Sequence, residues 1–315
     1  MQLKEKNQTP LTTVIVVTYN SGKFVLETLE SIKNQTYPNI ELIISDDASK
    51  DNTLDICYKW IKRSKQRFTN CCIIESKQNY GTAHNINKAI IKSNGVNIKL
   101  IAADDIMLPD YLSFVTTHLL ENPKKQILYT NTIILKSNGK LDYDVNKFHS
   151  RRPINSPTIT PEKQSQILLR FNHIFAASVI VRKDVYDQIG LFNESFPLCE
   201  DLFFWFKAVK SNIKIHYADF YGIKYRKHDD SVQVFNSEKK LFTAYEMDLM
   251  NGILYLFLPH YPFKERLLVK FIYSAKIYLS KVFNNKRTIL SNLLIKTICT
   301  TPEFLLKLSR YKYFK

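Results

Sequence analysis

The sequence predicts an α/β fold built on a mostly parallel, doubly wound sheet with flanking helices. Three observations support this class: short apolar runs alternate with segments of helical spacing, the connections are short and polar, and the early strands end at polar or acidic residues. With 315 residues, 45% of them hydrophobic, the chain can bury a large core, which excludes intrinsic disorder. Only 7 Gly and 11 Pro exclude a collagen-like or low-complexity chain.

Four strands, each leading into a helix, are predicted in the first part of the chain. The runs TVIVVT, IELIIS and NIKLIA are apolar without strict alternation, which is typical of strands buried on both faces. In chain order we expect strand 13–18, helix 24–34, strand 40–45, helix 51–65, strand 72–75, helix 81–93, strand 97–102 and helix 112–121.

The pattern changes beyond residue 121. Asn138-Gly139 is typical of a hairpin turn after a strand, and Gly190 is typical of a helix end. We expect strand 126–135, a polar loop at 144–162, strand 176–181, helix 183–189, helix 200–209 and, from residue 236, basic helices.

Three acidic pairs are the candidate functional residues. Asp46-Asp47 and Asp104-Asp105 follow apolar strands, where ligands of doubly wound sheets bind, and Glu200-Asp201 begins a helix rich in Phe and Trp. The first pair could accept hydrogen bonds from a base or ribose, and the second could hold Mg²⁺ or Mn²⁺ against a diphosphate. A carboxylate of the third pair beside an apolar wall could act as a general base. Turns and helix starts also favour acids, so spacing alone leaves both interpretations open.

The charge is strongly basic, with 45 Lys and Arg against 29 Asp and Glu, a net of +16. Nucleic acid, an anionic membrane surface and an anionic substrate all fit this balance. Residues 260–315 hold 12 Lys and Arg against Glu265 and Glu303, so +10 of the excess lies there. This concentration in a helical segment disfavours a nucleic-acid groove. It suits either an anionic lipid surface or helices packed on the domain or on a second subunit.

The cysteine pattern and the N-terminal residues predict a cytoplasmic protein. The five cysteines are odd in number and include no C-x-x-C, so we expect neither a disulfide framework nor a zinc site. The polar start predicts no secretory signal, and we find no run of about 18 uncharged apolar residues. We therefore expect no membrane-spanning helix.

Taken together, the motifs resemble those of glycosyltransferase family 2, inverting enzymes of GT-A fold. The resemblance covers about residues 11–235, and the order and spacing of its motifs are specific. They are TVIVVTYNSGKFVLETLESIKNQTYPNIELIISDDASKDNT, NYGTAHNINKAI, ADDIMLPDYL, ASVIVRKDVYDQIGLFNE, CEDLFFWF and YRKHDDSV. It implies a nucleotide-sugar-binding half over 1–115, an acceptor-binding half with the catalytic base over 116–235, and a basic helical extension over 236–315.

The resemblance also implies roles for individual residues. Asp201 matches the catalytic base, with Glu200 as the second candidate. Asp104 matches the metal-holding acid of the D-x-D signature, with Asp105 beside it, and His228 matches a further metal ligand. The implied nucleotide-sugar contacts are Thr18, Tyr19 and Asn20 along the nucleotide, Asp46 at the base, Asp47 near the ribose, Asn79, Gly81 and Asn85 beside the nucleotide sugar, and Asp104 and Arg226 at the diphosphate.

The implied reaction moves a hexosyl or N-acetylhexosaminyl group, with inversion, from a nucleoside-diphosphate sugar to a glycan or lipid-linked saccharide. A UDP-sugar is the foremost donor, and Mn²⁺ or Mg²⁺ is the implied cofactor. The setting would be surface-polysaccharide synthesis in the cytoplasm. The protein would be peripheral on the inner face of the membrane, or its C-terminal helices would join two copies of the chain. In this sequence Ala102 replaces the first acid of the metal signature. This replacement leaves a non-catalytic nucleotide-sugar-binding protein as an alternative. The basic charge leaves a nucleic-acid-binding protein as another.

Overall fold

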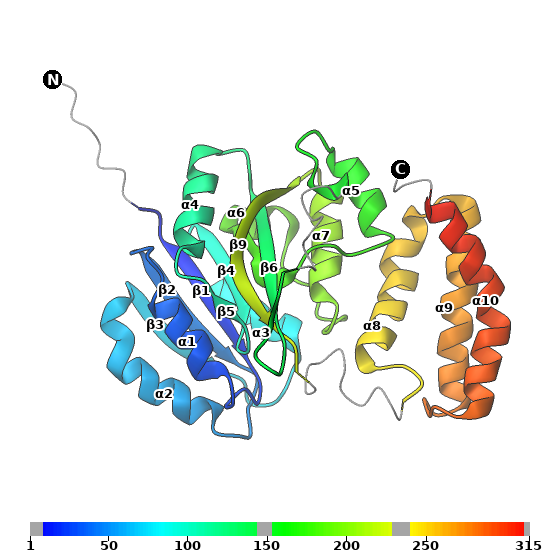
Figure 1. The fold of residues 1–315 in the computed structure, drawn as a ribbon, viewed down its shortest axis with the longest axis horizontal. Coiled ribbons are helices and arrows are strands. Elements are labelled where there is room, and N and C mark those ends of the chain that lie inside the picture. The colour runs from blue at the N-terminus through cyan, green and yellow to red at the C-terminus, as the bar shows by residue number, and fades with distance from the viewer. Residues whose placement is uncertain (1–8, 144–152, 229–239, 312–315) are drawn as a thin grey trace.

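A computed structural model describes residues 9–143, 153–228 and 240–311 (Figure 1). Its centre is a nine-stranded sheet with helices on both faces, and three further helices gather at one end (Figure 1). The strand order is β3-β2-β1-β4-β8-β6-β9-β5, with β7 paired to β6. The predicted α/β class with a mostly parallel sheet is confirmed in its first half, and the second half is mixed.

The first half is the predicted parallel array. Strands β1 and β2 are buried along nearly their whole length because helices cover both faces, which explains their unbroken apolar sequences. Its elements are β1 (Thr12–Thr18), α1 (Val25–Lys33), β2 (Ile40–Asp46), α2 (Thr53–Ser64), β3 (Asn70–Glu75), α3 (Thr82–Lys92) and β4 (Asn97–Ala102).

Antiparallel pairs appear in the second half. Strand β8 (Val179–Arg182) runs antiparallel between β4 and β6 (Ile127–Leu135), and β9 (Ile215–Arg226) then runs parallel to β6. Short strands β5 (Ile106–Met107) and β7 (Leu141–Asp142) pair with β9 and β6. The helices of this half are α4 (Tyr111–Glu121), α5 (Pro161–Leu168), α6 (Lys183–Ile189) and α7 (Glu200–Lys210).

Three local expectations need correction. Residues 176–178 form a 3₁₀ turn instead of the start of a strand, and β8 begins at residue 179. The expected loop at 144–162 contains a 3₁₀ turn at Pro153–Asn155 and the start of α5, while 144–152 lies outside the described residues. Strand β9 was missed because its twelve residues mix buried and half-exposed positions, so no clear period marks it.

The C-terminal extension contains α8 (Ala244–Gly252), α9 (Phe263–Val282) and α10 (Ile289–Tyr311). Phe257, in the turns after α8, packs its ring 4.4 Å from Phe206 of α7, and Arg170 forms a buried bidentate pair with Glu265 at 2.8 and 2.9 Å. Removing one partner of such a pair leaves an uncompensated buried charge, which costs about 3–5 kcal/mol. The extension therefore belongs to the same hydrophobic core as α7.

The expectation of no membrane-spanning helix has one candidate against it, judged by length and composition alone. Within the part of the chain that the structure describes, one segment, Ile289–Leu308 in α10, is long and apolar enough to do so, and 17% of its most apolar window is buried. Helix α10 packs along α9, and Lys276 of α9 pairs with Glu303 of α10 at 2.6 Å.

Candidate active site

The carboxyl ends of the parallel strands lie side by side. In the sheet register Thr18 is opposite Asp46, and Val17 is opposite Ala102. Asp104 and Asp105 follow directly in the turn that leads to β5, while β9 brings Arg226 to the same turn. The predicted residues from four separate segments are thereby brought to one edge of the sheet.

Asp46 is fully buried and already holds its own loop. Its Oδ2 accepts from Thr18 Oγ1 at 2.8 Å and from Ser49 Oγ at 2.6 Å, and its Oδ1 accepts from Ser49 N at 2.8 Å. Its backbone carbonyl accepts from Lys88 Nζ at 2.8 Å. Direct contact with a base, as the resemblance implies, would require Ser49 to release one of these oxygens.

Asp47 joins the β2 loop to the start of α3. It is 3% exposed, and its two oxygens accept from Tyr80 N at 3.0 Å and Gly81 N at 2.8 Å. Gly81 also donates to Asn79 Oδ1 at 3.0 Å. Its φ is +93°, and a Cβ there would lie 2.8 Å from Pro197 Cβ, so only glycine fits where the donor-side loop meets the segment before α7.

Asn85 and Asn20 are two of the three predicted amides, and they have different roles in the structure. Asn85 of α3 is 1% exposed and joins the helix to β2, donating to Ser45 O at 2.8 Å while its Oδ1 accepts from Ser45 Oγ at 2.8 Å. Asn20 has φ +48° and accepts from Lys50 N at 2.7 Å, which ties the loop after β1 to the loop after β2. Tyr19, the neighbour of Asn20 in the chain, is 48% exposed, so its aromatic ring is available to a ligand at this edge of the sheet.

Asp104 and Asp105 have different environments. Asp105 is 1% exposed, and its Oδ1 accepts from the backbone N of Arg226 at 3.0 Å. Burial and the neighbouring Asp104 charge raise the pKa of Asp105 well above its usual range. Asp104 is partly exposed, and its Oδ2 lies 3.0 Å from His228 Nε2.

A fully buried lysine lies behind this turn. Lys99 of β4 donates to the carbonyls of Ala177 and, at 3.2 Å, Val179, and burial lowers the pKa of Lys99 to about 7. The Asp105 charge acts in the opposite direction on the pKa of Lys99. A lysine within the apolar run NIKLIA is a sequence signal for such a buried charge, although the motifs assign no role to Lys99.

Arg226 and His228 are held against α1 and the residue before it. The Arg226 guanidinium lies 4.7 Å from the Phe24 ring centre and pairs with Glu27, and its Nε donates to Asp104 O at 2.8 Å. His228 lies with its ring 4.8 Å from that of Phe24. The Glu27 side chain is 56% exposed and that of Arg226 is 15% exposed, so solvent reaches this pair from the Glu27 side.

The Glu200-Asp201 pair begins α7 beside the aromatic residues that predicted an apolar wall. Asp201 Oδ1 accepts from Leu202 N at 2.6 Å, and its Oδ2 accepts from Asn172 Nδ2 at 3.3 Å. Burial and the adjacent Asp201 raise the pKa of Glu200 to about 8, and burial raises the pKa of Asp201. Because the two carboxyl groups interact, they titrate as a pair.

Tyr225 connects this pair to the Asp104 turn. Burial raises the pKa of Tyr225, and so do the charges of Asp105, Asp104 and Asp201. One side chain is therefore within electrostatic reach of both acidic sites.

Asp248 of α8 was not predicted, and it contacts the backbone next to the catalytic candidates. Its Oδ2 accepts from Leu198 N at 2.9 Å and Cys199 N at 3.1 Å, and its charge contributes to the raised pKa of Glu200. No sequence pattern links this residue to a helix that begins 48 positions earlier. The C-terminal extension therefore takes part in the site.

Of the three predicted cation ligands, Asp104 and His228 lie 3.0 Å apart, whereas the buried Asp105 accepts from the Arg226 backbone. Among the described residues no group of three or more His, Cys, Asp or Glu could hold a metal ion. Mg²⁺ is commonly held by one or two carboxylates, with substrate phosphates and water completing its shell. The partly exposed Asp104 beside an imidazole fits such a site.

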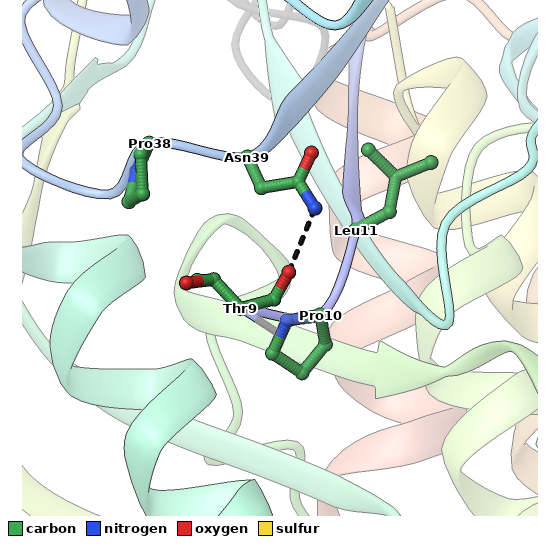
Figure 2. A pocket seen from close by; sticks show the side chains of 5 residues that line it. All are labelled: Thr9, Pro10, Leu11, Pro38 and Asn39. Atoms are coloured by element: carbon green, nitrogen blue, oxygen red, sulfur yellow. Dashed lines mark hydrogen bonds between the residues drawn. The ribbon is translucent and has the colours of Figure 1, made fainter. Parts of the chain in front are cut away.

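A separate pocket of about 520 Å³ lies at the amino ends of β1 and β2 (Figure 2). Figure 2 shows its lining residues Thr9, Pro10, Leu11, Pro38 and Asn39, with Asn39 Nδ2 donating to Thr9 O at 2.7 Å. It contains no charged side chain and lies at the opposite ends of the strands from the acids. The pocket is thus distinct from the candidate active site.

Residues 13–190 match the model of the family described as "Glycosyl transferase family 2". The chain belongs to glycosyltransferase family 2. A relative from Escherichia coli, "UDP-Glc:alpha-D-GlcNAc-diphosphoundecaprenol beta-1,3-glucosyltransferase WfaP", is 32% identical over 235 residues, which are 73% of this chain and 82% of that protein. An "Uncharacterized glycosyltransferase" of Haemophilus influenzae is 29% identical and covers 73% of this chain and 70% of its own. A longer Rickettsia felis relative is 28% identical, and the match spans 35% of it.

Solved structures of other proteins share the fold. The structure "S. aureus TarS 1-349 in complex with UDP-GlcNAc" has a TM-score of 0.59 at 18% identity, covering 91% of this chain and 79% of that one. "Mannosyltransferase PcManGT from Pyrobaculum calidifontis in complex with GDP-Man and Mn2+" has a TM-score of 0.57 at 15% identity, covering 98% and 73%. This family 2 glycosyltransferase therefore has the GT-A fold, as the sequence predicted.

Proposed function

We propose that this glycosyltransferase moves a hexosyl or N-acetylhexosaminyl group, with inversion, from a UDP-sugar to a saccharide or lipid-linked saccharide acceptor. The observation that carries the proposal is the partly buried Glu200-Asp201 pair at the start of α7, where Asn172 donates to Asp201 Oδ2 and the pKa of each carboxyl group is raised; Asp201 also acts on Tyr225, as do Asp104 and Asp105. Inverting transfer needs a proton acceptor on one side of the sugar and stabilisation of an anionic leaving group on the other.

On the donor side, the loops after β1, β2 and β3 would hold the nucleotide. Tyr19 offers an exposed ring, and Asn20 and Asp47 fix the loops around it through their bonds to Lys50, Tyr80 and Gly81. Thr18 and Asp46 are buried in a mutual hydrogen bond, and Asn85 lies beneath them. We assign Asp46 and Asn85 to the shape of the site, with Asn79 and Gly81 at its rim beside the nucleotide sugar.

Asp201 is the proposed base. Its carboxylate would take the proton of the acceptor hydroxyl as that oxygen attacks the anomeric carbon and the bond to the nucleoside diphosphate breaks. Burial favours proton uptake, and the bond from Asn172 orients the Oδ2 atom. Glu200, with a pKa of about 8, is the second candidate for the same task.

The leaving diphosphate would lie between Asp104, Arg226 and His228. A Mn²⁺ or Mg²⁺ ion held by Asp104 and His228 would neutralise charge on the diphosphate. Arg226 would add a fixed positive charge after exchanging Glu27 for the phosphate oxygens, and Asp105 keeps the Arg226 backbone in place through its 3.0 Å bond.

The acceptor class follows from the WfaP relative, whose name specifies a GlcNAc-diphosphoundecaprenol acceptor. We propose a lipid-linked saccharide of surface-polysaccharide assembly as the acceptor here, with the enzyme in the cytoplasm. The five cysteines of the chain, at Cys57, Cys71, Cys72, Cys199 and Cys299, are all free thiols in the structure, which fits a reducing compartment.

The direct test is a panel of nucleoside-diphosphate sugars, first by thermal shift and then by release of nucleoside diphosphate in the presence of saccharide or polyprenyl-diphosphate acceptors, with and without Mn²⁺. A ligand that binds the native state raises its melting temperature. We expect a UDP-sugar to give the largest Mn²⁺-dependent shift and acceptor-dependent release. Binding of a donor without release under any acceptor or metal would reject the enzyme assignment.

Ala102 favours one alternative, a non-catalytic nucleotide-sugar binder, because it removes an acid from the metal signature. Ala102 is exposed at the end of β4, next to the Asp104 turn. An Ala102→Asp variant separates the two functions. It should tighten Mn²⁺ activation of an enzyme, whereas a binding protein would gain metal affinity without turnover.

A further inference from the structure

Helix α9 exposes a mainly apolar stripe although the opposite face of the helix is packed. Its exposed members are Phe263 (72% exposed), Leu267 (55%), Phe271 (50%), Tyr278 (67%) and Val282 (57%). At about 100° per residue these five positions fall within an arc of about 100°. Large aromatic and aliphatic side chains that are all exposed along one helix face mark an interaction surface.

Helix α10 repeats this pattern. Its large exposed apolar side chains are Ile289 (91% exposed), Leu290 (56%), Leu293 (57%), Phe304 (58%), Leu305 (48%) and Leu308 (53%). The six positions fall within an arc of about 160°, opposite the buried Ser291, Cys299 and Leu306. Figure 1 shows α9 and α10 together at the end of the molecule that is farthest from β2 and β3.

Basic side chains border both stripes. On α9 the exposed residues Lys264, Lys270 and Lys281 lie at the edges of the apolar arc, and on α10 the exposed Lys296 and Lys307 do the same. The two acids of the segment are both engaged elsewhere, Glu265 in the buried pair with Arg170 and Glu303 in the pair with Lys276. The outer faces are therefore mainly apolar with positive margins, and the uncharged Ser274 of α9 and Thr297, Thr300 and Thr301 of α10 are the exposed polar residues within them.

We propose that the outer faces of α9 and α10 lie in the plane of an anionic phospholipid surface. An exposed apolar stripe with lysines at its margins suits the boundary between acyl chains and negative headgroups, because both the apolar area and the charge are complementary to that boundary. A second protein surface would have to supply a matching apolar strip and also matching acids.

The helices lie on the bilayer and do not cross it. Lys296 and Lys307 lie about two and five turns into α10, and Glu303 pairs with Lys276 of a neighbouring helix whose opposite face packs against the domain. An α10 that crossed the bilayer would carry these charges into hydrocarbon and would have to leave α9. This inference is independent of the proposed reaction, since vesicle binding is measured without donor or acceptor.

The test is flotation of the full chain with vesicles of phosphatidylglycerol and phosphatidylcholine, or of phosphatidylcholine alone. We expect binding to the anionic vesicles, weak binding to the neutral ones, and release of bound protein by alkaline carbonate. Leu267→Glu with Phe271→Glu should abolish binding. The matched control is Ile91→Glu with Leu120→Glu, which adds the same charge at exposed apolar positions of α3 and α4 (72% and 52% exposed) and should bind as the parent does.

A second variant leaves the apolar stripe unchanged. Lys264→Gln, Lys270→Gln and Lys281→Gln together should weaken binding to anionic vesicles on the order of a hundredfold, about fivefold for each basic residue. It should also reduce the salt dependence of binding. Thermal unfolding of every variant at the parental temperature establishes that the fold is retained.

Three results would overturn the proposal. Equal binding of parent and Leu267→Glu/Phe271→Glu protein would place any lipid contact elsewhere. A dimer in light scattering that the double variant abolishes, without vesicle binding by the parent, would assign the surface to a second copy of the chain. Protein released from vesicles by detergent but not by carbonate would indicate a spanning helix. Loss of transfer activity with normal vesicle binding would instead count against the proposed function alone.

Discussion

The acids of the donor-side loops and the acids at the start of α7 are held in opposite ways. Asp46 and Asp47 accept five hydrogen bonds from Thr18, Ser49, Tyr80 and Gly81, three of them from backbone amides. Glu200 and Asp201 are adjacent and partly buried, and the pKa of each is raised, that of Glu200 by burial and by the Asp201 charge and that of Asp201 by burial. The first arrangement fixes the backbone around a ligand, whereas the second keeps a carboxylate ready to accept a proton.

Loss of the proposed base should have the largest effect. Asp201→Asn removes the proton acceptor while the amide preserves the volume, so kcat should fall about 10²–10⁴-fold with donor affinity unchanged. Rates are measured by nucleoside diphosphate release and affinity by thermal shift. Glu200→Gln is the comparison variant and should retain most of the rate. If Glu200→Gln is inactive and Asp201→Asn is not, the two roles are exchanged.

Asp104→Asn should come next, because it removes the carboxylate of the proposed cation site. We expect kcat/KM to fall on the order of 100-fold and the activating concentration of Mn²⁺ to rise. Asp55→Asn, an exposed acid on α2, is the matched control and should leave both quantities unchanged. An Asp104→Asn enzyme with parental Mn²⁺ dependence would remove Asp104 from the metal site.

Replacing Asp47 on the donor side should mainly lower the stability of the protein. In Asp47→Asn an NH₂ group replaces one of the two oxygens that accept from Tyr80 N and Gly81 N, so a partly buried amide loses its acceptor. That should lower the free energy of unfolding by about 1–3 kcal/mol, measured by urea denaturation. The Asp201→Asn protein should unfold at the parental urea concentration or above it. A stable Asp47→Asn protein with weak donor binding would mean that Asp47 contacts the ligand directly.

The sequence predicted the parallel half of the sheet well because each of its strands is a continuous apolar run. The sequence was less successful where a strand is buried on one side only, or where the residues that constrain a segment are distant in the chain. Strand β9 shows no clear period, and residues 176–178 have strand-like composition but turn at the point where Lys99 binds their carbonyls. Local composition cannot encode that constraint, since it comes from a lysine about 80 positions away in the chain.

The site residues show the same division. The motifs placed the acids at the ends of β2 and β4 and at the start of α7, and the structure has them there. The partners of these acids were missed, because Asn172 and Asp248 reach the α7 pair only through the fold. For the same reason the sequence could not show that both oxygens of Asp46 are engaged.

Substitution of Asp248 should have the smallest effect on activity. It also tests most directly how the acids at the start of α7 differ from those of the donor-side loops. Burial is the largest cause of the raised pKa of Glu200, followed by Asp201 and then Asp248, so neutralising Asp248 should lower the apparent pKa of the pair by less than one unit. The base must be deprotonated, so activity is lost as the pH falls through that pKa, and Asp248→Asn should move this acid limb to lower pH. The Asn oxygen can still accept from Leu198 N and Cys199 N, which preserves the start of α7. The measurement is the pH profile of kcat/KM, with Asp248→Ala as the variant that loses both the charge and the acceptor. A profile of Asp248→Asn that coincides with the parent, while Asp248→Ala loses activity at every pH, would reduce Asp248 to a purely structural contact.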